Sequence, residues 1–324
     1  MMRLISALVL GVALQCATAD AQTYPSRPIT LMVPFAAGGP ADTLARFIAE
    51  PMKKALNQQI VVEDVPGAAG TLGVGRVVHA APDGYTIGIG HLGTHVFNGA
   101  VYKLSFDLVN DLEPIAYLPS NAYVITAKAG VPAKTVPELV AWLKANPAEA
   151  TAGTAGLGSI GHLATVDFEQ RTGVSLRIVP YRGGAPAFND LVGGNITLLM
   201  DLPTASALAI GREKKLHYYA VMAPHRLPAA PDVPTVDEVG LNGLYVAAWY
   251  GLWAPKGTPK EIVAKLNEAV RVALADPEFR KRMQAQSAIF PTPEQQTPEW
   301  LGQFQRNEVA KWWPLIKAAN IKVQ

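Results

Sequence analysis

A serine and a histidine three positions apart, Ser159 and His162, are residue types that can act as a nucleophile and its general base. The sharp turn that exposes a nucleophilic serine needs a glycine two positions before it, and Leu157 stands there instead. The segment Gly158-Ser159-Ile160 is more typical of a helix start, with Ser159 as the N-cap residue. A secreted hydrolase therefore ranks only third among the functions that we consider.

His91 and His95 are a second candidate pair, since imidazole nitrogens bind zinc. They are separated by the loop-like stretch Leu92-Gly93-Thr94, and no third ligand is evident, whereas zinc sites use three or four protein ligands. We therefore expect no metal and no cofactor. The favoured interpretation is that both histidines lie in a loop and face solvent or a ligand cleft.

The third candidate is an anion site formed by backbone rather than by side chains. Ile29–Val33 reads as a buried strand, Pro34 to Gly39 as a turn of small residues, and Pro40 as the first residue of a helix. A strand, a glycine turn and a helix in this order direct unpaired N–H groups and a positive dipole end at one point. A carboxylate fits there as well as a phosphate, although an ordinary βα loop is the alternative.

The glycines at 67, 70, 73 and 75 do not make this a nucleotide site. Their spacing lacks the G-x-G-x-x-G pattern, and no acidic residue follows about twenty positions on at a strand end. Nucleotide binding is therefore disfavoured.

The N-terminus has the layout of a secretory signal peptide, predicted to span residues 1–21. Arg3 precedes an apolar run, Leu4 to Leu14, and Ala19-Asp20-Ala21 matches a cleavage site before Gln22. Cys16 is the single cysteine, and lipidation there is a weak alternative because the bulky Gln15 precedes it. We therefore expect an exported mature chain without disulfides or cysteine chemistry.

Composition narrows the class of partner. The formal net charge is only +2, charged residues make up 17% of the chain, and no basic cluster of the kind that follows a phosphate backbone is present. Nucleic acid is therefore not an expected partner. The mature length of about three hundred residues is enough for two lobes with separate cores.

Strands and helices are predicted to alternate along most of the chain, which is typical of α/β sheets that are mostly parallel and flanked by helices. Residues 22–122 and 246–324 are predicted to form lobe 1, and residues 123–245 lobe 2, with a ligand cleft between them. Thr135 and Thr258 are predicted to cap helices in capping boxes with Glu138 and Glu261, and Asp276-Pro277 and Thr297-Pro298 are predicted to start two further helices. The predicted elements are strands at 29–33, 60–62, 86–89, 123–127, 176–179, 196–200 and 249–254, and helices from 40, 71–80, 135–145, 160–171, 187–192, and from 258, 276 and 297.

Four loops at predicted strand ends carry small or polar residues suited to line one cleft. In an open α/β sheet, residues just past the carboxyl ends of the strands face the ligand crevice. The loops are Phe35–Gly39, Gly90–Thr94, Thr154–Ser159 and Tyr181–Asp201.

Segments across the whole mature chain resemble the Bug family, the periplasmic receptors of tripartite tricarboxylate transporters. The matching stretches are YPSRPITLMVPFAAGGPADTLAR at 24–46, PDGYT at 82–86, VPAKTVPELVAW at 131–142, VPYRGGAPAFNDLVGGNI at 179–196, PDVPTVDEVGL at 231–241 and WYGLWAPKGTPKEIVAKLN at 249–267. The resemblance implies a two-lobed receptor with the type II periplasmic binding protein fold. It further implies a monomer, rather than an enzyme, that closes on a small di-, tri- or aromatic carboxylate and delivers it to inner-membrane transporter subunits.

The resemblance also implies the residues of the ligand site. The ligand carboxylate would be held by backbone amides of the first loop, with Thr94 near the ligand's other end and side chains of lobe 2 completing the pocket. A sensor-kinase domain as the partner, in place of a permease, remains the alternative. The implied residues are Phe35, Ala36, Ala37, Gly38, Gly39, His91, Thr94, Ser159, His162 and Asp201.

Two departures from the family pattern leave the identity of the carboxylate open. His91 and His95 stand where many relatives carry small or amide residues, and no amide follows Asp201 at its strand end. Both departures fall in loops that we expect to face the ligand.

Overall fold

The computed structural model describes residues 24–181, 183–203, 211, 213 and 215–318. The predicted signal peptide and Cys16 lie outside the described residues. Within the described part, no helix is both long and apolar enough to cross a membrane.

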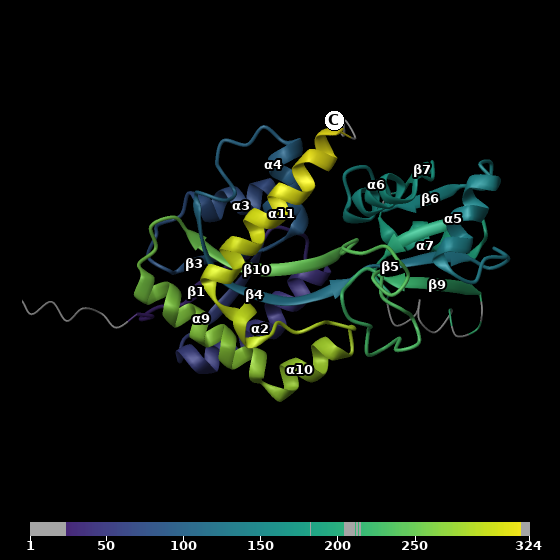
Figure 1. Cartoon of the computed structure of the whole chain (residues 1–324). Helices are drawn as coiled ribbons and strands as arrows, with labels where there is room; N and C mark the ends of the chain where they lie inside the picture. The colour runs from purple at the N-terminus through teal and green to yellow at the C-terminus, as the bar shows by residue number, and fades with distance from the viewer. Residues whose placement is uncertain (1–23, 182, 204–210, 212, 214, 319–324) are drawn as a thin grey trace, which may run out of the picture.

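Two five-stranded sheets organise the chain, and Figure 1 shows them side by side, each with its own helices. The first sheet has the order β2-β1-β3-β10-β4. Its strands are β1 (Ile29–Val33), β2 (Ile60–Asp64), β3 (Thr86–His91), β4 (Leu112–Ala122) and β10 (Ala247–Pro255). The second sheet has the order β7-β6-β8-β5-β9. Its strands are β5 (Val124–Lys128), β6 (Thr151–Thr154), β7 (Arg177–Pro180), β8 (Leu198–Asp201) and β9 (Leu216–Val221).

The two sheets share one topology. In each, one strand that enters from the other half of the molecule, β10 or β5, runs antiparallel to both neighbours, while the remaining neighbours pair in parallel. We call the first sheet with its helices lobe 1 and the second sheet with its helices lobe 2. The expected α/β fold with mostly parallel sheets is confirmed, and each sheet is mixed because of its one antiparallel strand.

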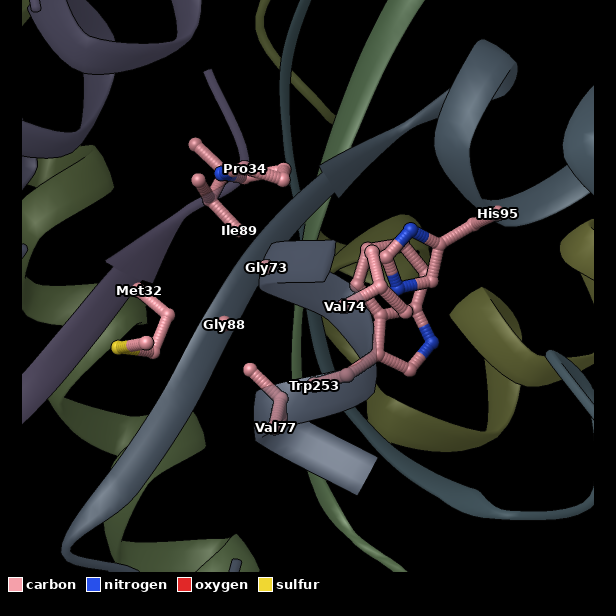
Figure 2. A pocket seen from close by; sticks show the side chains of 9 residues that line it. All are labelled: Met32, Pro34, Gly73, Val74, Val77, Gly88, Ile89, His95 and Trp253. Atoms are coloured by element: carbon pink, nitrogen blue, oxygen red, sulfur yellow. The ribbon is translucent and has the colours of Figure 1, made fainter. Parts of the chain in front are cut away.

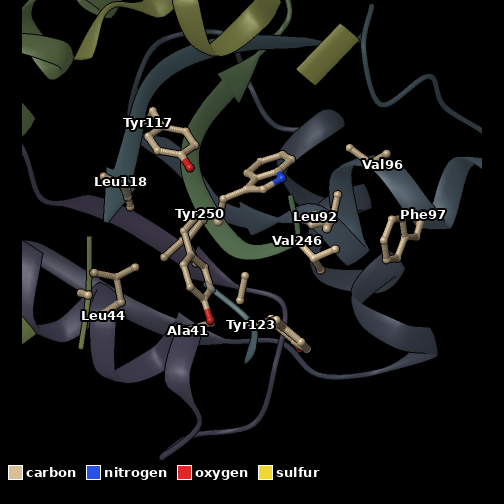
Figure 3. Close-up of a cluster of buried hydrophobic side chains, with 14 of the residues drawn as sticks. Ala41, Leu44, Leu92, Val96, Phe97, Tyr117, Leu118, Tyr123, Val246 and Tyr250 are labelled. Carbon is tan, nitrogen blue, oxygen red and sulfur yellow. The ribbon is translucent and has the colours of Figure 1, made fainter. Parts of the chain in front are cut away.

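The chain passes between the sheets at two places. Strand β4 ends at Ala122 and β5 begins at Val124 in the other sheet, while β10 returns the chain to the first sheet at Ala247. Figure 1 shows β4 and β10 running together toward lobe 2. Side chains at this crossover, Tyr123, Val246 and Tyr250, belong to one continuous buried cluster (Figure 3).

The helices flank the sheets. Helix α2 packs against α9 and α10, and α11 packs against β4, so the three C-terminal helices cover lobe 1. The helices of lobe 1 are α2 (Pro40–Leu56), α3 (Thr71–Val78), α4 (Asn98–Val101), α9 (Lys260–Ala275), α10 (Pro277–Gln284) and α11 (Pro298–Ala318). Those of lobe 2 are α5 (Val136–Ala145), α6 (Ile160–Thr172) and α7 (Gly184–Val192), and single turns lie at Ala68–Gly70, Gly93–Phe97 and Pro293–Gln296.

Most of the predicted helix starts are confirmed, and one is wrong. Thr135 accepts a hydrogen bond from the Glu138 N–H, Asp276 from the Phe279 N–H and Thr297 from the Trp300 N–H. Thr258 does not cap α9, because its hydroxyl donates to the Pro255 carbonyl and Pro259 occupies the N-cap position.

Candidate functional site: a cleft between the lobes

A hollow of about 480 Å³ lies between the two lobes. Lobe 1 lines it from the loop after β1, the turn at Ala69 and the segment that follows β3, whereas lobe 2 lines it mainly from the loop after β6. The lining residues are Phe35, Ala69, His91, Gly93, Phe97, Asn98, Val101, Tyr102, Tyr123, Ala155, Gly156, Leu157, Gly158, Ser159 and Ile160. A hollow of similar size beside Gly99–Asp111 has lining residues from lobe 1 alone, so the cleft is the better small-molecule site.

The wall contributed by lobe 1 is largely aromatic. The ring of Phe35 stacks on His91 with centroids 4.8 Å apart, and Tyr250 meets the other side of His91 edge-on at 5.9 Å. His91 Nδ1 accepts the Gly93 N–H at 2.8 Å, so its proton sits on Nε2. Burial lowers the pKa of His91 to about 4, and the imidazole is therefore neutral at neutral pH.

A strained turn extends this wall. Ala68 and Ala69 both have positive φ, 46° and 52°, a backbone conformation that residues other than glycine seldom adopt. The Asn98 amide donates to the Ala69 carbonyl at 3.0 Å and holds the turn against the cleft. Strained backbone of this kind is concentrated at ligand sites.

The wall contributed by lobe 2 is a short loop of small residues before α6. Ser159 is the N-cap of α6 and accepts the His162 N–H at 3.2 Å, which confirms the capping role predicted for it. The Ser159 side chain also borders the cleft. Gly161 allows α6 to start here, because a Cβ at that position would stand 2.6 Å from the Met200 carbonyl oxygen.

Some of the predicted site residues line the cleft and the others do not. Phe35, His91 and Ser159 line the hollow, whereas the remaining seven are not among its lining residues. Ala36, Ala37 and Gly38 are exposed in the loop after β1, and Gly39 is partly exposed.

Thr94 and His162 act through other groups. Thr94 is buried, and its hydroxyl oxygen accepts the His91 N–H at 3.0 Å, so it supports the histidine rather than facing the cleft. The His162 imidazole accepts the Gly158 N–H at 2.9 Å. Both side chains therefore hold segments that do reach the cleft.

Asp201 ends β8 close to the crossover. Its Oδ1 accepts the N–H of Leu202 at 2.8 Å, and burial raises its pKa. Burial also raises the pKa of Tyr123, with the charge of Asp201 adding to the effect. Tyr123 lines the hollow, whereas Asp201 itself does not.

The expectation that His95 faces solvent or the cleft is wrong. His95 is 3% exposed and stacks on Trp253 at 3.9 Å beside a cavity of about 10 Å³ in the core of lobe 1 (Figure 2). Burial lowers the pKa of His95 to about 3. The apolar neighbours Leu92, Val96 and Phe97 are the sequence signal that a buried position was possible.

Sequence reasoning missed much of the cleft lining. Ala155 to Gly158 belong to the loop Thr154–Ser159 that was expected to line the cleft, although only Ser159 was named as a ligand contact. Asn98 and Tyr102 were not expected, because they follow the predicted loop after β3 rather than lying in it. Nothing in their residue types distinguishes them, since only the fold brings them together. Of the four loops predicted to converge, the first three supply lining residues, whereas no described residue of Tyr181–Asp201 lines the hollow.

Two mixed α/β lobes with a cleft between them are the architecture of a solute-binding protein. The family model for the tripartite tricarboxylate transporter family receptor, TctC, matches residues 44–321. Protein BugT of Bordetella pertussis is 30% identical over 329 residues, covering 100% of this chain and 99% of BugT.

Solved structures of similar proteins indicate the same family. MatC of Rhodopseudomonas palustris, solved with bound malate, is 39% identical with a TM-score of 0.74, covering 90% of this chain and 100% of MatC. The R. palustris protein Rpa4515, solved with adipate, is 32% identical with a TM-score of 0.75, covering 92% of this chain and 99% of Rpa4515. The chain belongs to the tripartite tricarboxylate transporter receptor family, also called the Bug family, and is a periplasmic solute-binding receptor rather than an enzyme.

Proposed function

We propose that this receptor closes its two lobes on a small organic carboxylate with an apolar body and delivers it to the inner-membrane subunits of its transporter. The observation that carries the proposal is the cleft. Aromatic residues of lobe 1 line one wall, and a loop of small residues in lobe 2, whose backbone amides are accessible to a ligand, lines the other. Apolar walls with a few placed polar groups are typical of small-molecule sites. The malate and adipate in the two R. palustris structures support a carboxylate as the ligand.

The proposed lobe boundaries follow the two crossovers. Lobe 1 comprises residues 22–122 and 246–324, and lobe 2 comprises residues 123–245, with a cleavable signal peptide at 1–21 that exports the chain to the periplasm. We propose a monomer, since one chain supplies both walls of the cleft.

The proposed site combines direct and supporting residues. Phe35, His91 and Ser159 contact the ligand, Thr94 and His162 hold the segments of His91 and Gly158 in place, and Asp201 contributes to the pocket from lobe 2. Ala36, Ala37, Gly38 and Gly39 approach the ligand when the lobes close. Closure follows from population shift, because a ligand that contacts both lobes stabilises the closed form.

The aromatic rings of Phe35, Phe97, Tyr102 and Tyr123 favour a particular kind of carboxylate. They bury apolar carbons well, whereas hydroxyl or extra carboxylate groups placed against them lose hydrogen bonds to water. We therefore expect adipate and benzoate to bind more tightly than malate and citrate.

Thermal shift and calorimetry with these four carboxylates test the proposal. A ligand at a hundred times its Kd raises the free energy of unfolding by about 2.7 kcal/mol, an effect that thermal unfolding detects readily. Leu157→Asp should abolish the shift, because Leu157 is 60% exposed on the cleft wall and a carboxylate there repels an anion. Val272→Asp is the matched control, since Val272 is 46% exposed on α9 and does not line the cleft. No shift with any of the four carboxylates would contradict the proposed function.

A further inference from the structure

The two lobes repeat one local arrangement, where α2 follows β1 in lobe 1 and where α6 follows β6 in lobe 2. Gly38 in lobe 1 and Gly158 in lobe 2 are both left-handed, with φ of 82° and 78°. Each immediately precedes the N-cap residue of its helix, Gly39 for α2 and Ser159 for α6. The residue four positions after each glycine, Asp42 or His162, turns its side chain back onto that glycine's N–H.

In lobe 1 the acceptor is a carboxylate. Asp42 is 3% exposed, and its Oδ2 accepts the Gly38 N–H at 2.7 Å. Its Oδ1 pairs with Arg46 Nε at 2.6 Å, and Arg46 also pairs with Asp64 at 2.8 Å. The carboxylate is thus fixed from two sides, and it brings a negative charge to the first turn of α2.

In lobe 2 the acceptor is a neutral ring. His162 is 7% exposed, and its Nδ1 accepts the Gly158 N–H at 2.9 Å. Burial lowers the pKa of His162, which keeps the imidazole uncharged. The first turn of α6 contains no acidic residue, so its amides keep their positive potential on the cleft side.

We propose that Asp42 and His162 are matched positioning residues, which hold the ligand loops of the two lobes in place before the ligand arrives. We further infer that their different charge makes the loop of lobe 2 the stronger pole for an anion. Loops ordered in advance lose less conformational entropy on binding, and affinity rises accordingly. This inference deepens the proposed function and rests on it for the ligand, but the positioning roles do not depend on the ligand's identity.

The two acceptor atoms are equivalent in covalent position. The Asp Oδ, His Nδ1 and Asn Oδ1 atoms all stand one bond beyond Cγ, so asparagine can replace either residue and still accept the glycine N–H. Alanine removes the acceptor in both lobes. Asparagine is therefore the rescue variant in each lobe.

Hydrogen exchange without ligand tests the positioning roles. We expect Asp42→Ala to speed exchange in residues 34–42 roughly tenfold and His162→Ala to do so in residues 154–162, with each effect confined to its own lobe. Asp42→Asn and His162→Asn should restore most of the protection. Equal exchange in the alanine and asparagine variants, or no change in either loop, would overturn the positioning roles.

Calorimetry with the tightest binder among adipate, benzoate, malate and citrate tests the inference about charge. His162→Asp keeps an acceptor but adds a carboxylate, and we expect it to weaken binding roughly tenfold, an effect that salt reduces. Asp42→Asn should not weaken binding. The reverse pattern would overturn the inference about charge. If none of the four binds wild type, the proposed function and this inference fall together, while the exchange result still decides the positioning roles.

Discussion

The loops after β1 and β6 occupy equivalent places in two sheets of the same strand order, yet they contribute differently to the cleft. The loop of lobe 1 presents Phe35 to the hollow while Ala36, Ala37 and Gly38 are exposed. The loop of lobe 2 borders the hollow along its whole length, from Ala155 to Ser159. Equivalent topology and an equivalent helix start therefore do not imply equal contact with a ligand.

The difference suggests a division of labour between the lobes. Lobe 1 offers rings that can cover an apolar body, and lobe 2 offers backbone amides that can meet a charged group. In the proposed closure, Ala36 to Gly39 of the loop of lobe 1 approach the ligand, whereas Phe35 already lines the hollow. The predictions below separate the two lobes by stability, pH dependence and binding.

Low pH should destabilise the folded protein through His95, the buried histidine in the core of lobe 1. The pKa of His95 is about 3 in the folded protein, against an ordinary value of 6.5, so below pH 6.5 the unfolded state takes up a proton that the folded state refuses. The contribution of His95 to stability should fall as the pH drops and level off below about 3, with a loss of roughly 3 kcal/mol by pH 4. Urea unfolding at a series of pH values, followed by tryptophan fluorescence, measures the loss.

His95→Phe provides the control for this prediction. It keeps a ring stacked on Trp253 and removes the titrating group. The variant should show a flatter dependence of the free energy of unfolding on pH than wild type. Parallel curves for the two proteins would show that His95 is not the group responsible.

Tight packing at the start of α6 should make lobe 2 the more sensitive to an added methyl group. Gly161→Ala would place a Cβ 2.6 Å from the Met200 carbonyl oxygen, and we expect it to cost about 2 kcal/mol. Gly39→Ala at the start of α2 meets the Ala36 carbonyl oxygen at 3.4 Å and should cost less than about 1 kcal/mol. Equal losses of the free energy of unfolding for the two variants, measured by urea unfolding, would contradict the expected difference in packing.

The paired left-handed glycines allow the same backbone change in each lobe. Gly38→Ala and Gly158→Ala should each lose about 1 kcal/mol of stability, because an alanine Cβ is strained at positive φ. Only Gly158→Ala should weaken ligand binding strongly, roughly tenfold, because Gly158 itself lines the cleft and Gly38 does not. Equal effects on the Kd of the two variants, measured by calorimetry, would remove the functional difference between the loops.

The smallest expected difference in stability between the lobes comes from the N-cap side chains of α6 and α2. Ser159→Ala removes a side-chain cap from α6 and should cost about 1 kcal/mol. Gly39→Ser supplies one to α2, which has none, and should gain only a few tenths of a kcal/mol because glycine is already a tolerable N-cap. Thermal unfolding should therefore move in opposite directions for the two variants.

Much of the fold could be predicted from the sequence because local signals agreed with the tertiary structure. The strand at Ile29–Val33, the helix from Pro40 and the N-cap at Ser159 all follow from periodicity and capping chemistry. The strand β4 (Leu112–Ala122) was not predicted at all. It contains Pro114 and Pro119, which read as strand breakers but are tolerated because β4 is the edge strand of its sheet.

The candidate site was less predictable because it depends on contacts between distant segments. His91 and His95 look alike in sequence, and only the turn at Gly93–Phe97 sends one to the cleft and the other into the core. The likeness of Asp42 and His162 was hidden for another reason. Their residue types differ, and what they share is a glycine four positions earlier whose backbone conformation is not visible in the sequence.

The central claim is that the loops of both lobes meet on one carboxylate, and hydrogen exchange with and without the tightest-binding carboxylate of the four tests it most directly. The account predicts that residues 34–42 and residues 154–162 both gain protection, with the same dependence on ligand concentration. Protection of one loop alone, or of neither loop under conditions where calorimetry shows saturation, would contradict it.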